Sequence, residues 1–292
     1  VRMWDMIIYN DLKKKGIVIP PKKEHDKSEK YAGAYVKEPI PGMYDWVVSF
    51  DLNSLYPHLI MQYNISPETV LDERFPSVSV DKLLNEEVDL SGLKDVTVCP
   101  NGAMFTTKKR GFLPKLMEKI YNERVIFKKK MLEAKKEYEK TPTKRLEKEI
   151  ARCNNIQMAK KIQLNSAYGA IGNNYFRYYM LANAEAITLG GQFSIRWIER
   201  KINQYMNKVL KTEEKDYVIA SDTDSIYLHM GDLVSRVYEG REKTTEGIVS
   251  FIDKVCQVEL EKYISSSYEA LASYVNAYEQ KMFMKRETIA ER

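Results

Sequence analysis

Two long amphipathic segments separated by three residues constrain the fold of this chain more than any other feature. Apolar side chains recur at helical spacing between residues 113 and 138, at Leu116, Ile120, Phe127, Met131 and Ala134. The run Thr141-Pro142-Thr143 breaks this pattern, and a second helical pattern extends from Lys144 to about residue 170. Two long helices with so short a connection must fold back on each other. The sequence therefore predicts an antiparallel helical hairpin that projects as an arm.

The predicted arm is strongly basic. The chain has 292 residues and a formal net charge of only +5, but residues 108–161 contain 18 Lys and Arg against 7 Asp and Glu. This segment has a local balance of +11, so the rest of the chain carries −6. A basic segment attached to an acidic body fits a protein that holds a polyanion at one place and metal ions at another. A solvated helix surface rich in Lys and Glu explains the same charges and stays open.

Composition excludes several classes of protein. Apolar residues make up 44% of the chain, and its 20 Tyr, 9 Phe and 3 Trp are spread along it, which excludes low-complexity disorder. The apolar runs are too short to cross a bilayer, and the first residues do not have the pattern of a signal peptide. Cys99, Cys153 and Cys256 lie far apart and form no Cys-x-x-Cys pair, so neither a disulfide framework nor a zinc site is expected. A reducing cytoplasm is the simplest setting.

Outside the arm, the sequence predicts both strands and helices. Residues 46–50 form a β-branched and aromatic run typical of a buried strand that ends at Asp51, and Asn53-Ser54 then starts a helix. Residues 217–220 and 226–228 predict a hairpin, and residues 281–284 predict a final strand. Residues 182–210 and 248–278 have helical patterns, and residues 1–45 predict a helix followed by a connector rich in Pro, Lys and Gly. Residues 65–105 are expected to be irregular.

Three carboxylates lie at the predicted ends of these strands. Asp51 closes the first strand, and Asp222 and Asp224 lie at the tip of the hairpin, where their spacing aims both side chains to one side if the backbone stays extended. Carboxylates gathered at one sheet edge repel each other unless cations bridge them, and Mg²⁺ prefers such oxygen ligands. Two ions about 3.5–4 Å apart can hold the attacking and leaving oxygens of a phosphoryl transfer. A polar turn without function stays open for Asp-Thr-Asp-Ser taken alone.

Three longer motifs occur in a fixed order along the chain. They are Asp51-Leu52-Asn53-Ser54-Leu55-Tyr56-Pro57, then Lys161-Ile162-Gln163-Leu164-Asn165-Ser166-Ala167-Tyr168-Gly169, then Asp222-Thr223-Asp224-Ser225. Together they resemble the polymerase motifs of family B DNA polymerases, and most of all those of the replicative polymerases of T-even-type bacteriophages, including their marine relatives. Gly33-Ala34-Tyr35-Val36-Lys37-Glu38-Pro39 and Gly111-Phe112-Leu113-Pro114 are similar to that group as well. The resemblance extends over roughly residues 31–292.

The resemblance implies roles for particular residues. Asp51 and Asp224 match the carboxylates that hold two Mg²⁺ ions, for which Mn²⁺ can substitute, and the Leu52 carbonyl is a further ligand; Asp222 matches a supporting catalytic position. The residues that match the nucleotide site are Leu52, Asn53, Ser54, Leu55, Tyr56, Arg124, Lys128, Lys161, Asn165, Tyr168 and Gly169. Arg124 with Lys128, and Lys161 with Asn165, are each i, i+4 on one helix face, so three cations and an amide surround one triphosphate if the faces meet.

Two aromatic positions and one acidic position also match. The Tyr56 ring matches the residue that lies under the sugar and excludes a 2′-OH, with a core tyrosine as the alternative. Tyr168 and Gly169 match positions near the nascent base pair, where glycine allows close approach. Glu287 aligns with an acidic residue near the active site.

The implied fold is α+β, with an antiparallel palm sheet backed by helices and an inserted two-helix fingers hairpin. Residues 1–110 are expected to form the N-terminal part of the palm with a connector, residues 111–172 the fingers, and residues 173–292 the C-terminal part of the palm. The exonuclease motifs and the thumb of the family are not found in the sequence. Ser221 stands where the family usually has glycine, which puts the hairpin geometry in question, and His58 replaces the commoner serine.

The implied function is template-directed DNA synthesis in the cytoplasm of an infected bacterium. The partners are primer–template DNA and deoxynucleoside triphosphates, with a sliding clamp and other replisome proteins contacted through the full-length polymerase. The chain is expected to be a monomer with no membrane association. The alternatives are a catalytically silent fragment that binds nucleotide or DNA, and a metal-dependent nuclease, which gives no role to Tyr56 or to the Lys161 helix.

Overall fold

The main sheet of the molecule has five strands, and every neighbouring pair in it is antiparallel. The computed structural model describes residues 1–23, 30–240 and 244–291, so residues 24–29 of the predicted connector lie outside the described residues. The strand order is β1 (Val36–Lys37), β6 (Val218–Asp222), β7 (Ser225–His229), β2 (Val47–Leu52) and β8 (Met284–Ala290). Strand β2, predicted from its β-branched and aromatic run, is thus central and pairs with both β7 and β8.

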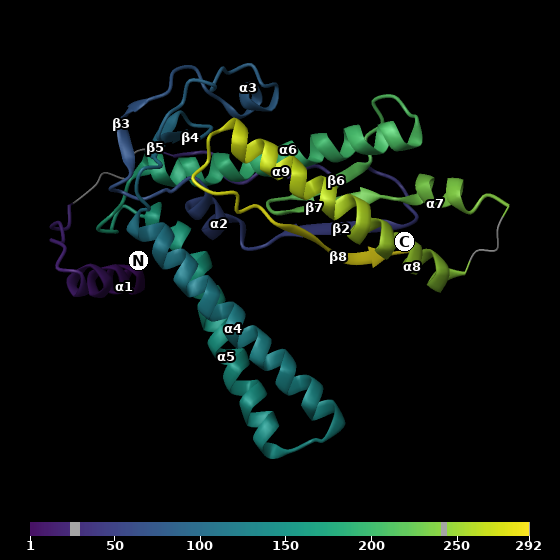
Figure 1. Cartoon of the computed structure of the whole chain (residues 1–292), viewed down its shortest axis with the longest axis horizontal. Coiled ribbons are helices and arrows are strands. Elements are labelled where there is room, and N and C mark those ends of the chain that lie inside the picture. Colours follow the sequence, from purple (N-terminus) through teal and green to yellow (C-terminus); the bar gives the residue numbers. More distant parts are fainter. Residues whose placement is uncertain (24–29, 241–243, 292) are drawn as a thin grey trace.

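Helices cover one face of this sheet and leave the other open. Val48 and Phe50 of β2 are fully buried, and helices α6 (Leu181–Leu210) and α9 (Glu261–Tyr274) pack over the sheet (Figure 1). Residues of the opposite face alternate with the core residues, as expected for a sheet that is half solvated. Asp51 is half-buried on that face, and Tyr227 is 40% exposed. The open face is therefore the polar one.

Further helices flank the sheet and the base of the arm (Figure 1). They are α1 (Arg2–Lys14), α2 (Leu55–Gln62), α7 (Gly231–Val237) and α8 (Thr245–Val255), with a π-helical turn η1 (Cys256–Leu260) joining α8 to α9. The predicted helix over residues 248–278 thus ends earlier, at Tyr274, and contains one turn of different geometry. Within the described residues, no helix combines the length and the apolar character needed to span a membrane.

The predicted arm is present, as helices α4 (Phe112–Lys140) and α5 (Lys144–Ile171). They run antiparallel and project away from the body (Figure 1). The Thr143 side chain accepts a hydrogen bond from the Leu146 backbone and caps the start of α5, as its sequence position before a helical run indicates. Buried Met131, Ala134 and Cys153 line the seam between the two helices. The prediction of an antiparallel hairpin is confirmed.

The segment expected to be irregular is folded. Residues 65–105 include helix α3 (Val80–Leu84) and most of a three-stranded antiparallel sheet, in the order β3 (Val70–Arg74), β5 (Ala103–Thr106) and β4 (Val96–Val98). Strand β4 has three residues and β3 is mostly exposed, so neither shows the alternation by which strands are recognised in a sequence. The final strand was also misplaced, because β8 begins at Met284, where predicted residues 281–284 end.

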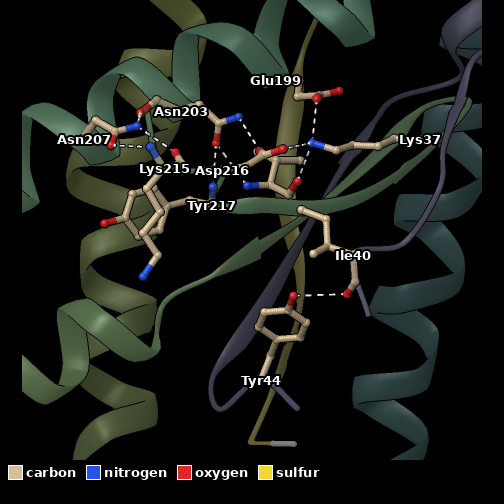
Figure 2. A network of polar contacts seen from close by, with 10 residues as sticks. Lys37, Ile40, Tyr44, Glu199, Asn203, Asn207, Lys215, Asp216 and Tyr217 are labelled. Atoms are coloured by element: carbon tan, nitrogen blue, oxygen red, sulfur yellow. Dashed lines mark hydrogen bonds and ion pairs between the residues drawn. The ribbon is translucent and has the colours of Figure 1, made fainter. Parts of the chain in front are cut away.

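A polar network fixes the outer strands to α6. Lys37 Nζ of β1 donates to Glu199 Oε1 (2.8 Å) and to Asp216 Oδ2 (2.6 Å), as Figure 2 shows. It also donates to the Val218 carbonyl at 2.8 Å. Burial alone would lower the pKa of Lys37, but hydrogen bonds to Asp216 and Glu199 outweigh it and raise the pKa. Asn203 of α6 accepts from the backbone of Tyr217 and Val218. These bonds anchor the start of β6, and hence the hairpin that carries Asp222 and Asp224.

Candidate functional site

Asp51 and Asp224 meet at the end of the central strands. Asp51 is opposite Ser225 in the β2–β7 register, and the Leu52 backbone N–H donates to the Asp224 carbonyl at 2.8 Å. Both carboxyl groups are half-buried. The tip of the β6–β7 hairpin is thereby pinned against the last residues of β2. The prediction that Asp224 lies at a hairpin tip is confirmed, whereas the strand predicted to end at Asp51 continues for one more residue, to Leu52.

Asp222 lies apart from this pair. The backbone is not extended through the tip, because Thr223 has a left-handed φ of 52°, so Asp222 and Asp224 do not have the extended geometry that the i, i+2 argument required. Asp222 is exposed, and its Oδ1 accepts a hydrogen bond from Thr223 Oγ1 at 2.9 Å. Its charge raises the pKa of Asp224, whereas it is not among the causes of the shift at Asp51.

Ser221 does not distort the hairpin. It pairs with Ile226 within a continuous register from Ala220 to Asp222; the register shift of the β6–β7 pair lies before it, between Val218 and Ala220, and the positive φ falls on Thr223. The doubt raised by serine in place of glycine therefore does not apply to the backbone. The energetic cost of serine at this position comes from its side chain, because the buried Ser221 hydroxyl has no hydrogen-bond partner among the described residues.

Glu287 of β8 is the third carboxylate of this region. Its charge raises the pKa of both Asp51 and Asp224, while the charge of Lys161 on the arm lowers both. Burial is the largest cause at each aspartate, and together these effects raise the pKa of Asp51 to about 6. Lys285 stands opposite Asp51 in the β2–β8 register. Sequence reasoning gave Lys285 no role, and only the strand register brings it to this site.

The donor set fits a hard divalent cation. Burial and neighbouring carboxylates raise the pKa of both Asp51 and Asp224, and a cation stabilises the charged form of such groups. Mg²⁺ is commonly held by one or two carboxylates together with substrate phosphates. In the part of the chain that the structure describes, no group of three or more His, Cys, Asp or Glu side chains has an arrangement that could hold a metal. Asp51 and Asp224 are thus candidates for a two-carboxylate site, and Glu287 contributes charge from a greater distance.

The turn after β2 is tied to the root of the arm. Ser54 has a left-handed conformation (φ 49°, ψ 60°) and caps α2, and its Oγ accepts a hydrogen bond from Arg124 Nη1 of α4 at 3.1 Å. His58 is buried, its Nδ1 lies 3.0 Å from the Ser54 carbonyl oxygen, and its ring meets Tyr121 of α4 edge-on at 4.5 Å. His58, which stands where the family more commonly has serine, therefore links the turn to the arm. Its position in the sequence did not indicate this role.

The four arm residues predicted to grip a triphosphate are brought together only in part. Arg124 contacts the turn after Asp51, and Lys161 lies within the electrostatic reach of both aspartates. Lys128 and Asn165 are exposed, and their side chains form no hydrogen bond or ion pair with the described residues. Their side chains are accessible from solvent, so the shared grip stays a prediction.

Aromatic residues pack together at the base of α5, where the rings of Tyr56 and Tyr168 are tilted by 42°. The Tyr56 and Tyr168 ring centroids lie 4.6 Å apart, and the Tyr168 hydroxyl donates to the Tyr31 hydroxyl at 3.1 Å. Burial, followed by the hydrogen bond to Tyr31, raises the pKa of Tyr168. Tyr31 was not predicted, because the residues before it show no periodic pattern. Asn53 is exposed, whereas Leu52 and Leu55 are buried and support the turn from the core side.

The sequence as a whole matches one family. The profile of DNA polymerase family B covers residues 4–265. The DNA-directed DNA polymerase of Escherichia phage RB69 is 36% identical over 99% of this chain, and that of Enterobacteria phage T4 is 34% identical over 99%. DNA polymerase 1 of Pyrococcus abyssi is 31% identical over 85% of this chain. The chain spans 36% of the length of the two phage proteins and 28% of the archaeal one. On this evidence, together with the ordered motifs at the strand ends and on the arm, the chain belongs to DNA polymerase family B.

Proposed function

We propose that this chain carries the nucleotidyl-transfer site of a DNA-directed DNA polymerase. The observation that carries the proposal is the meeting of Asp51 and Asp224 at the end of the sheet, within reach of Lys161 from the basic arm. In this assignment, residues 1–110 and 173–292 form the palm, and residues 111–172 form the fingers. The substrates would be primer–template DNA and deoxynucleoside triphosphates. The phage relatives suggest the cytoplasm of an infected bacterium as the place of action.

Two Mg²⁺ ions are proposed as cofactors, with Mn²⁺ as a substitute. Asp51 and Asp224 would hold them, with the Leu52 carbonyl as a further ligand and Asp222 in a supporting role. When bound, such ions neutralise phosphate charge and favour deprotonation of an attacking hydroxyl. The half-buried positions of the two carboxylates at an open sheet face leave room for substrate oxygens to complete the coordination.

The arm would bind the triphosphate. Arg124, Lys128, Lys161 and Asn165 offer donors from two facing helices, and a guanidinium can donate two parallel hydrogen bonds to phosphate oxygens. In the present structure Arg124 is held by Ser54 Oγ, so binding of a nucleotide would exchange a neutral partner for a charged one. The arm would then move toward the sheet and complete the site, as closing elements of many enzymes do.

The tilted ring pair Tyr56–Tyr168 would face the sugar and the new base pair. Tyr56 is packed against Tyr168 and lies at the start of α2, and in this position its ring would leave little space for a 2′-OH. A Cβ added at Gly169 would have no protein atom within 4 Å. Because nothing inside the described chain requires glycine there, we assign its absence of a side chain to close approach of the nascent base pair.

Primer extension with Mg²⁺ tests the proposal. Longer products that disappear in Asp224→Asn, with the fold retained by circular dichroism, are the expected result. An unchanged primer together with retained nucleotide binding would identify a silent binding fragment, and shorter products would identify a nuclease. Near-normal extension by Asp224→Asn would contradict the metal assignment.

A further inference from the structure

Strand β8 contains a bulge at Glu287. In the β2–β8 register, Arg286 pairs with Phe50 and Thr288 pairs with Ser49. Glu287 is therefore one extra residue that has no pairing partner in β2. Residues on either side of a bulge are re-aimed, and bulges often occur beside active sites. Here Glu287 and Thr288 are both exposed, and the Thr288 N–H donates to Ser49 Oγ on the polar face at 3.1 Å. The bulge thus directs Glu287 to the face that carries Asp51.

Arg286 anchors the bulge from the other side of the sheet. It pairs with buried Phe50, so its side chain points toward the helices and not toward the open face. There its Nη2 forms an ion pair with Asp253 Oδ1 of α8, and its backbone N–H donates to Glu261 Oε1 of α9 at 3.3 Å. Gln257 Nε2 donates to the other Asp253 oxygen at 2.9 Å, which orients that carboxylate. Helices α8 and α9 therefore hold both the side chain and the backbone of Arg286.

The π-helical turn explains why two acidic residues reach the same strand. Residues eight apart in an α-helix, such as Asp253 and Glu261, point about 80° away from each other. A π turn adds one residue without advancing the helix, which reduces this angle to about 20°. The π turn Cys256–Leu260 lies between these two residues. It turns both carboxylates toward β8.

We infer that Arg286, held by Asp253 and Glu261, is a positioning residue that keeps the bulge of β8 in the form that presents Glu287 to Asp51 and Asp224. The inference rests on the proposed function, because it takes Asp51 and Asp224 as the cation site. Glu287 adds negative charge near that site and so attracts divalent cations. The π turn, the ion pair and the bulge together form one support behind the site.

Binding of Mn²⁺ to the whole chain, followed by electron paramagnetic resonance of the free ion, tests the inference without any need for turnover. Arg286→Met and Glu287→Gln should each weaken Mn²⁺ binding by roughly tenfold, the size typical of groups outside the ligand shell. The double variant should bind no more weakly than Glu287→Gln alone, because Arg286 then has no carboxylate to position. Arg145→Met, which removes an equal charge from the exposed start of α5, is the control and should bind as the parent does.

The outcomes separate the inference from the proposed function. Parent-like Mn²⁺ binding by Asp224→Asn overturns the assigned cation site. Lost binding in Asp224→Asn together with parent-like binding in Arg286→Met, or multiplied losses in the double variant, overturns the inference alone. If Arg286→Met does not fold, two variants at Glu261 test the inference in its place. Glu261→Gln keeps an acceptor for the Arg286 N–H and should bind Mn²⁺ normally, whereas Glu261→Leu should bind weakly; equal binding by the two overturns the inference.

Discussion

Gly169 and Gly172 lie three residues apart at the end of α5 but have different surroundings. A Cβ at Gly169 meets no atom within 4 Å, whereas a Cβ at Gly172 would lie 2.3 Å from the Tyr31 hydroxyl oxygen. We expect Gly169→Ala to stabilise the fold by up to about 1 kcal/mol, because alanine favours a helix, and Gly172→Ala to destabilise it by about 1 kcal/mol through loss of the Tyr31–Tyr168 hydrogen bond. Urea denaturation of both variants measures the change in the free energy of unfolding and its sign. Shifts of the same sign would contradict this account. Under the proposed function, Gly169→Ala should extend primers poorly despite its stability.

His58 makes stability depend on pH. Burial is the main reason that the pKa of His58 is lowered, the charges of Lys281 and Arg124 act in the same direction, and the hydrogen bond to the Ser54 carbonyl opposes them. The unfolded chain therefore binds a proton at higher pH than the folded chain does, so the free energy of unfolding should fall as the pH drops from about 7 toward about 5. Denaturation across this range should give a shallower dependence in His58→Gln. The pKa of His229 is lowered too, so His229→Gln measures how much of the pH dependence comes from that residue. An unchanged dependence of stability on pH in His58→Gln would contradict the role given to His58.

At the scale of an element, helix α5 presents two neighbouring lysines to different surroundings. Lys160 forms an ion pair with Glu123 of α4 at 2.5 Å, while Lys161 lies near Asp51 and Asp224. We expect Lys161→Ala to weaken binding of a deoxynucleoside triphosphate by about 1.5–3 kcal/mol, the value of a hydrogen bond to a charged group, and Lys160→Ala to have little effect. Isothermal titration with the nucleotide and Mg²⁺ measures both. Retained nucleotide binding with lost DNA binding in Lys161→Ala would make the arm a grip for DNA instead.

At the scale of the whole molecule, the charge is divided between arm and body. The arm segment has a balance of +11 and the remainder −6, and the cations nearest the sheet are already assigned to the triphosphate. The other arm cations are spread along exposed helices away from the sheet and are not gathered into one site for duplex DNA. We therefore expect weak primer–template binding by this chain that is measurable at about 50 mM salt and lost by about 200 mM salt. Fluorescence anisotropy with labelled primer–template measures the dependence. Tight binding at the higher salt concentration would show that the body contributes phosphate contacts that its net charge conceals.

Local patterns along the chain were sufficient to predict much of this structure. The apolar repeat and the break at Pro142 determine the hairpin α4–α5, because one helix turn depends on residues four apart and a proline acts where it stands. The runs that end at Asp51 and flank Asp222 and Asp224 determine β2, β6 and β7 for the same reason. The ordered motifs then determined the family. Each of these features is encoded by residues close together in the sequence.

Only the tertiary structure decided which side chains share a surface. The short strands β3, β4 and β5 exist through pairing with each other, and the burial that would mark them comes from distant residues. Thr223 takes the left-handed position that separates Asp222 from Asp224, and the β2–β8 register, with its extra residue, brings Glu287 and Lys285 to Asp51. The sequence motif singled out Lys161, but only the packing of the helices showed that neighbouring Lys160 forms an ion pair with Glu123. Register, bulges and helix facing depend on contacts between residues far apart in the sequence. A shift of one residue in a strand register turns every side chain of that strand to the other face, so no local pattern specifies these features.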